Sequence, residues 1–115
     1  MTAFRILLFA LFLNIIVYTA IVIGNHGANL VPDFLGDIAA VGWPGQFNVD
    51  FTSFLILSAL WVAWRHHFSP VGLVLAVPAL FGGIMFLAPY LLIASYAAKG
   101  DIRILLLGSA RAGAD

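Results

Sequence analysis

Three long apolar segments, separated by shorter polar breaks, dominate the pattern of the chain. The first covers about residues 5–23, the second about 47–64 and the third about 70–96. About 20 apolar residues in a helix cover the roughly 30 Å of hydrocarbon in a bilayer. The pattern therefore predicts an all-α fold, an integral membrane three-helix bundle that forms a single membrane domain over residues 1–115.

The first two predicted spans fit a bilayer to different degrees. Residues 6–25 hold no Asp, Glu, Lys, Arg or His, a run longer than the apolar part of a cleaved signal peptide. We therefore expect a retained helix at the amino terminus. In the second span, Asp50 and Arg65 limit the uncharged part to 14 residues, which rise only about 21 Å. This span requires a thinner membrane, an Asp50 carboxylate at the level of the headgroups, or a helix that starts with Asp50 packed against protein.

The third predicted span is the most apolar part of the chain. Residues 68–98 contain no charged residue and no histidine. A straight helix over 70–96 would extend about 40 Å, which exceeds the hydrocarbon thickness. We expect this helix to be tilted or kinked, with the kinks at Pro78, Gly82-Gly83 and Pro89.

The segments outside the spans are expected to lie at the membrane surface. The loop 24–46 is rich in Gly, Pro and Asp and cannot cross the bilayer, but Pro32 to Val41 can form a short interfacial helix. The tail 99–115 is expected to be interfacial or disordered, with one turn of helix from Ile102 to Leu107 followed by a disordered end.

The distribution of positive charge gives a divided answer about orientation. Three crossings would put Arg5 and Arg65 on one side of the membrane and Lys99, Arg103 and Arg111 on the other. Because the first helix usually dominates, and because the first loop has no Lys or Arg, we expect a cytoplasmic amino terminus and a tail on the far side.

Composition excludes several classes of protein. Hydrophobic residues make up 63% of the chain and charged residues 9%, so five basic and five acidic side chains cannot cover a soluble domain. The net charge of zero, without a basic cluster, argues against nucleic-acid binding. The absence of cysteine excludes disulfides and thiolate metal sites.

Asn14 is the polar residue nearest the middle of the first span. An unpaired amide is costly in hydrocarbon, so Asn14 needs a partner. Counted from the ends marked by Arg5 and Arg65, Asn14 and Ser58 lie at similar depths, about 13–14 Å and 10–11 Å. We expect an interhelical hydrogen bond between them, which fixes the packing of the helices. The alternative is a ligand or ion site.

Asp50 is the acidic residue next to a span, and two interpretations of it remain open. A carboxylate in the first helical turn would cap free amides and interact favourably with the helix dipole. An ionisable residue near hydrocarbon is also a candidate proton or cation site.

No residue constellation defines an enzyme, a metal site or a cofactor site. The adjacent His66 and His67 project about 100° apart on a helix, which is a poor geometry for shared metal ligation, so interfacial anchoring explains them better. The serines have no His or Lys at a spacing typical of nucleophilic catalysis. We expect no catalytic residues, no metal and no cofactor.

Three runs of sequence resemble small uncharacterised multi-pass proteins of bacterial inner membranes, a domain-of-unknown-function family. They are Gly-Trp-Pro-Gly-Gln-Phe-Asn-Val-Asp-Phe before the second span, Ala-Leu-Trp-Val-Ala-Trp-Arg at its end and Phe-Leu-Ala-Pro-Tyr-Leu-Leu in the third, within residues 42–96. The resemblance implies a bacterial inner-membrane location and no activity.

These features predict a non-enzymatic integral membrane protein. Its partners would be the lipid bilayer and either other membrane-protein subunits or further copies of itself, so it would be an accessory or assembly subunit or a small homo-oligomer. The alternative is a component for proton, ion or small-solute transport in which Asp50 and Asn14 line a path formed by several protomers.

Overall fold

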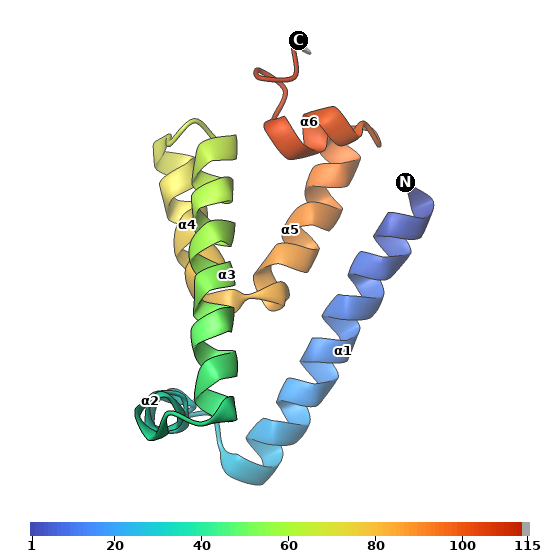
Figure 1. Ribbon diagram of the computed structural model, residues 1–115. Coiled ribbons are helices and arrows are strands. Elements are labelled where there is room, and N and C mark those ends of the chain that lie inside the picture. Colours follow the sequence, from blue (N-terminus) through green and yellow to red (C-terminus); the bar gives the residue numbers. More distant parts are fainter. Residues whose placement is uncertain (114–115) are drawn as a thin grey trace.

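The computed structural model describes residues 1–113, which form six helices (Figure 1). They are α1 (Thr2–His26), α2 (Val31–Ala40), α3 (Trp43–Arg65), α4 (Pro70–Gly82), α5 (Ile84–Ala97) and α6 (Ile102–Leu107). The prediction of an all-α protein is confirmed. Two of these helices, α1 and α3, are long and apolar enough to cross a membrane by length and composition.

The second predicted helix begins earlier than expected. α3 starts at Trp43, with Gly42 as its N-cap residue and Pro44 in its first turn, where proline lacks only an amide that would be unpaired anyway. Its 23 residues therefore rise about 34 Å, whereas the uncharged part alone rises about 21 Å. The extension into the polar sequence gives α3 the length of a spanning helix.

The prediction of one continuous third helix is wrong. The chain leaves the helical conformation at Gly83, whose φ of +54° and ψ of −134° belong to a region that side chains rarely adopt. A Cβ at Gly83 would also lie 2.7 Å from Cζ of Phe51, so a glycine is needed here for close approach to α3. The sequence signal for a kink at Gly82-Gly83 marked the correct place, but the result is two helices of 13 and 14 residues.

α4 and α5 run in opposite directions along the molecule (Figure 1). α4 begins beside the end of α3, where a Cβ at Gly72 would lie 2.7 Å from Cβ of His66, and it ends beside the middle of α3 at Phe51. α5 then returns along α1 to the level of the amino terminus, where the Arg5 guanidinium donates hydrogen bonds of 2.9 and 3.0 Å to Oγ and O of Ser95.

The two ends of the described chain therefore lie at the same end of the molecule (Figure 1). Met1 and Phe4 pack against the buried cluster of Ala94, Ala98 and Leu105. The expectation that the termini lie on opposite sides assumed a third complete crossing. It is wrong for this fold because the chain turns back at Gly83.

The short helix of the loop is confirmed as α2. It packs across the start of α3, where the side-chain amide of Asn48 donates a 3.2 Å hydrogen bond to the carbonyl of Phe34. Gly45 makes this packing possible, because a Cβ there would overlap the backbone carbonyl of Asp37 and lie 3.0 Å from Cα of Ile38. α2 is thus fixed to α3 rather than lying free.

The tail also has more structure than expected. Asp101 caps α6 by accepting hydrogen bonds from the amides of Arg103 and Ile104, and Leu105 is buried. Beyond α6, the Arg111 guanidinium lies 4.0 Å from the centroid of the Trp64 ring and donates to the Trp64 carbonyl. The expected disordered end therefore does not apply to residues 108–113, and residues 114–115 lie outside the described part.

Candidate functional site

The fold gathers the basic residues of the chain at one end and three of its five Asp residues at the other. The basic end, where both ends of the described chain lie, holds all of the Lys and Arg residues, namely Arg5, Arg65, Lys99, Arg103 and Arg111, and also Asp101 at the start of α6. The acidic end, at the corner between α2 and α3, holds Asp33, Asp37 and Asp50. The sequence alone placed the basic residues on two sides. In the fold they lie at one end, because α5 brings Lys99 and the tail back beside Arg5.

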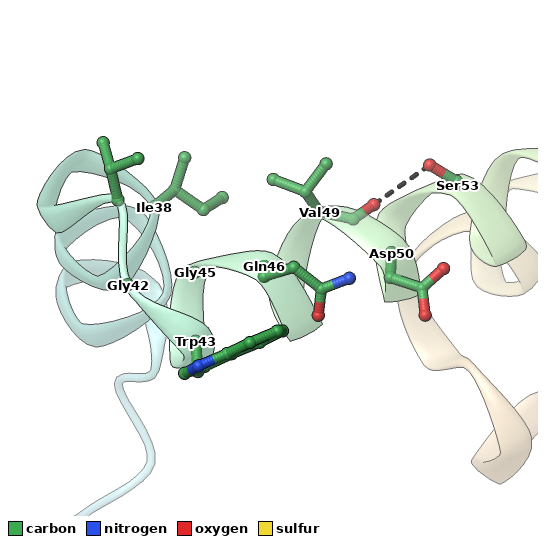
Figure 2. A pocket seen from close by; sticks show the side chains of 9 residues that line it. Ile38, Gly42, Trp43, Gly45, Gln46, Val49, Asp50 and Ser53 are labelled. Atoms are coloured by element: carbon green, nitrogen blue, oxygen red, sulfur yellow. Dashed lines mark hydrogen bonds between the residues drawn. The ribbon is translucent and has the colours of Figure 1, made fainter.

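A groove of about 850 Å³ opens at the acidic end and contains the sequence-predicted candidate Asp50 (Figure 2). Its walls come from the end of α2 and the first three turns of α3. Gln46 and Asp50 are one helical turn apart and therefore share a face of α3. Ser53 donates a 3.0 Å hydrogen bond to the carbonyl of Val49, so its hydroxyl is already used. The groove is large enough to hold water at the Asp50 carboxylate.

Asp50 is not a helix cap. α3 begins seven residues before Asp50, and no acidic residue lies in its first turn. Its N-cap residue is Gly42, and no side chain forms a capping hydrogen bond there. The Asp50 carboxylate is exposed and receives no hydrogen bond from the residues that the structure describes. The capping interpretation is therefore wrong, and Asp50 lies about 22 Å from Arg65 along the 34 Å helix, where the groove is open to its carboxylate.

Asn14 and Ser58 occupy different environments. Asn14 is exposed on α1, a helix whose only buried residue is Leu8, and within residues 1–113 its side chain forms no hydrogen bond. Ser58 Oγ is buried and also lacks a partner. α1 packs chiefly on α5 and α3 on α4, so the expected bond between Asn14 and Ser58 is not formed.

Ser58 lines a second cavity, of about 540 Å³, between α3 and α5. Apolar side chains form almost all of its wall, which comprises Phe51, Phe54, Leu55, Leu57, Ser58, Trp61, Gly83, Ile84, Leu87, Leu91 and Leu106. The cavity extends from the turn at Gly83 to the underside of α6. It exists because α4 and α5 separate at Gly83, so that α5 does not pack closely along α3.

Arg65 holds the short helix α6 in place at the basic end. Its Nε donates a 2.7 Å hydrogen bond to the carbonyl of Leu105, and its Nη2 lies 3.5 Å from the carbonyl of Ile104. Trp61 Nε1 donates a 3.0 Å hydrogen bond to the carbonyl of Leu106. These carbonyls belong to the last turn of α6, where positive charge is favourable, and of the three only that of Ile104 also accepts a backbone hydrogen bond within residues 1–113, from the Gly108 amide at 2.8 Å. Arg65 and Trp61 therefore act as the C-terminal cap of α6.

Tyr90 is the polar centre of the basic end. Its hydroxyl lies 3.2 Å from Nη1 of Arg65 and 2.7 Å from Nε2 of His66, and its ring stacks on Phe86 with a centroid distance of 5.4 Å. Desolvation by burial, with smaller contributions from Arg65 and His67, lowers the pKa of His66. A neutral His66 can accept a hydrogen bond from the Tyr90 hydroxyl through Nε2.

The sequence interpretation attributed Arg65 and His66 to interfacial anchoring and did not identify Tyr90. The one available signal was a phenol directly after Pro89 within an otherwise apolar run. That signal does not specify its partners, because Tyr90 and Arg65 are 25 positions apart.

The described residues contain no group of three or more His, Asp or Glu that could hold a metal ion. Comparisons of the chain with protein-family models, with curated proteins and with solved structures found no match. The resemblance to bacterial inner-membrane proteins of unknown function stays a prediction.

Proposed function

We propose that the chain is an integral membrane protein that acts, without catalysis, as an accessory or assembly subunit of a membrane complex or as a small homo-oligomer. In this proposal α1 and α3 cross the bilayer, while α4 and α5 enter it from one side and return to that side. The bacterial inner membrane is the location that the sequence resemblance implies.

The amount of exposed apolar surface supports a membrane setting. The radius of gyration is 16.2 Å, compared with about 13.4 Å for a compact soluble chain of this length. The accessible surface is 7800 Å², compared with about 6100 Å² for a soluble monomer of 12.4 kDa. Large apolar side chains such as Ile6 and Phe81 are 65% and 79% exposed. Lipid or partner helices would cover this surface.

The charge separation supports one orientation. Cytoplasmic segments of membrane proteins carry an excess of Lys and Arg. The end that holds Arg5, Arg65 and the tail would therefore face the cytoplasm, and α2 would face the other side. This retains the expected cytoplasmic amino terminus and moves the carboxyl terminus to the same side.

Single-cysteine labelling tests this topology, and the cysteine-free chain is well suited to it. Cysteines introduced as Thr2→Cys and Ser109→Cys should react with an impermeant maleimide only when the cytoplasmic side is exposed, and Asn29→Cys only from the opposite side. Labelling of positions 2 and 109 from opposite sides would refute the returning pair of helices. Release of the protein from membranes by carbonate washing would refute the membrane setting itself.

The observation that carries the assembly role is the exposed Asn14 side chain near the middle of α1. A carboxamide has two donor hydrogens and an acceptor oxygen, and hydrocarbon offers no partner for any of them. Interhelical hydrogen bonds of this kind contribute about 0.6–2 kcal/mol in membranes. A helix from another subunit or another copy would supply the partner that α5 does not.

Mild crosslinking in native membranes, followed by mass analysis, tests this role. Asn14→Leu should reduce the crosslinked species by about three- to thirtyfold, the equivalent of about 0.6–2 kcal/mol. Leu11→Ala, on the same helix, is the matched control and should have a smaller effect because the amide remains. A lone monomer in gentle detergent, with no crosslinked species in membranes, would contradict the proposal.

The transport alternative receives less support from the geometry. Asp50 is an exposed carboxylate in a groove large enough to hold water, as a proton site requires. However, α1 packs on α5 rather than along α3, so one protomer does not bring Asn14 and Asp50 together in a path. A path through both residues would need several copies.

A further inference from the structure

We infer that the cavity between α3 and α5 binds one acyl chain of an anionic phospholipid, whose phosphate is bound by Arg103 on α6. The inference depends on the membrane setting proposed above but not on the partner of α1. It adds a specific lipid to the protein, in contrast to the general lipid contact that any spanning helix makes.

The shape and lining of the cavity fit a hydrocarbon chain. Its walls are side chains such as Phe54, Leu87 and Leu91, and it runs from the turn at Gly83 up to Leu106. If α3 crosses the bilayer with Arg65 at one surface, the cavity lies within the hydrocarbon of the adjacent leaflet. A chain that enters from this surface would extend toward Gly83, parallel to its neighbours in the leaflet.

Ser58 makes no demand for a polar ligand. Thr52 and Ser53, on the same helix, donate hydrogen bonds of 2.8 and 3.0 Å to the carbonyls four residues earlier. The Ser58 hydroxyl can rotate to make the same bond to Phe54. A chain of methylene groups beside it would therefore leave no unpaired polar atom.

The position of Arg103 indicates the charge of the headgroup. Arg103 and Leu106 are three residues apart on α6 and therefore lie on the same side of that helix, and Leu106 forms the upper wall of the cavity. Arg103 is exposed, and its guanidinium makes no hydrogen bond within residues 1–113, whereas Arg5, Arg65 and Arg111 donate to protein groups. A free guanidinium on the same side of α6 as Leu106 suits a phosphate, which it can bind with two parallel hydrogen bonds.

The test is lipid titration of the full-length, delipidated protein by native mass spectrometry. Phosphatidylglycerol and phosphatidylcholine with identical acyl chains are the probes, and glycerol phosphate is the headgroup-only control. We expect one saturable phosphatidylglycerol per protomer, bound about fivefold more tightly than phosphatidylcholine, the equivalent of about 1 kcal/mol for one arginine at the surface. Glycerol phosphate alone should not bind measurably.

Two pairs of variants separate the headgroup contact from the chain contact. Arg103→Gln should weaken phosphatidylglycerol more than phosphatidylcholine, whose choline already offsets the phosphate charge, and so remove the fivefold preference. Lys99→Gln, which removes the same charge at the same end, should keep the preference. Ser58→Phe, which fills the cavity, should weaken both lipids at least tenfold, whereas Ser53→Phe on the groove side of α3 should not. If Ser58→Phe fails to fold, Leu87→Phe fills the cavity from the opposite wall.

Several results would overturn the inference. They are the absence of a saturable lipid, unchanged binding in both cavity-filling variants, and an equal loss of preference in Lys99→Gln and Arg103→Gln. Flotation of the protein with vesicles separates these outcomes from failure of the membrane setting, because a protein that floats but lacks the saturable lipid refutes only this inference.

Discussion

Replacement of Arg65 tests how the basic end is held together. In Arg65→Met, the side chain keeps much of its length but loses the hydrogen bonds to Leu105, Ile104 and Tyr90. The bonds of 2.7 and 3.2 Å count fully, and the contact of 3.5 Å is at the limit of a hydrogen bond. Only the 2.7 Å bond to Leu105 and the 3.5 Å contact with Ile104 reach α6, because Tyr90 lies on α5. A hydrogen bond from a charged donor contributes about 1.5–3 kcal/mol, so α6 should lose about 1.5–3 kcal/mol of docking free energy.

Amide hydrogen exchange measures this loss directly. Local opening that becomes about 1.5–3 kcal/mol easier should raise the exchange rate of the α6 amides, such as that of Leu105, by about 10- to 150-fold. Exchange in the middle of α1 should be unchanged, because α1 does not contact Arg65. Arg65→Lys should show most of the effect, since an ammonium cannot reproduce the forked geometry that reaches α6 and Tyr90.

Arg103→Met is the matched control, because Arg103 lies on α6 itself but its guanidinium makes no hydrogen bond within the described chain. Its α6 amides should exchange within about twofold of the wild-type rate. If Arg65→Met and Arg103→Met gave the same exchange rates, the interpretation of Arg65 as the C-terminal cap of α6 would be refuted.

Three further predictions concern the corner at α2, the free carboxylate and the histidine at the end of α3. Gly45→Ala should lower the free energy of unfolding in detergent by about 1–3 kcal/mol, because the new methyl group overlaps the backbone of α2, whereas Gly36→Ala, with open space around it, should be neutral or stabilising. Asp50→Asn should change the free energy of unfolding by less than about 0.5 kcal/mol, since the carboxylate is exposed; loss of a proton flux in proteoliposomes in this variant would favour the transport alternative over the accessory role. Because the pKa of His66 is lowered in the folded chain, this histidine takes up a proton in the unfolded chain first, as the pH falls below about 6.5. The free energy of unfolding should therefore decrease from about pH 6.5 down to the lowered pKa of the folded state and then level off. His66→Gln should remove that decrease in thermal unfolding measured between pH 7.5 and 5, and His67→Gln should retain it.

The all-helical fold, the short helix in the first loop and the two long apolar helices were predictable from the sequence. The reason is that these features depend on local properties, namely the length of apolar runs and the positions of Gly and Pro. The start of α3 was placed too late because the polar residues after Gly42 were taken as loop. Asp50 was consequently assigned to the first turn, although Pro44 is the residue typical of that position.

The path of the third apolar segment was decided only by the tertiary structure. Its composition is equally compatible with one tilted helix or with two shorter helices, since both bury the same apolar residues. The choice depends on the contact between Gly83 and Phe51, which are 32 positions apart, and on the hydrogen bonds from Arg5 to Ser95, which are 90 positions apart. These long-range contacts return α5 to the amino terminus and gather all five basic residues at one end. By itself, the sequence determined that the chain is apolar and helical, because each segment carries that information locally. The arrangement of its ends, charges and cavities depends on which distant segments meet, and only the folded chain specifies that.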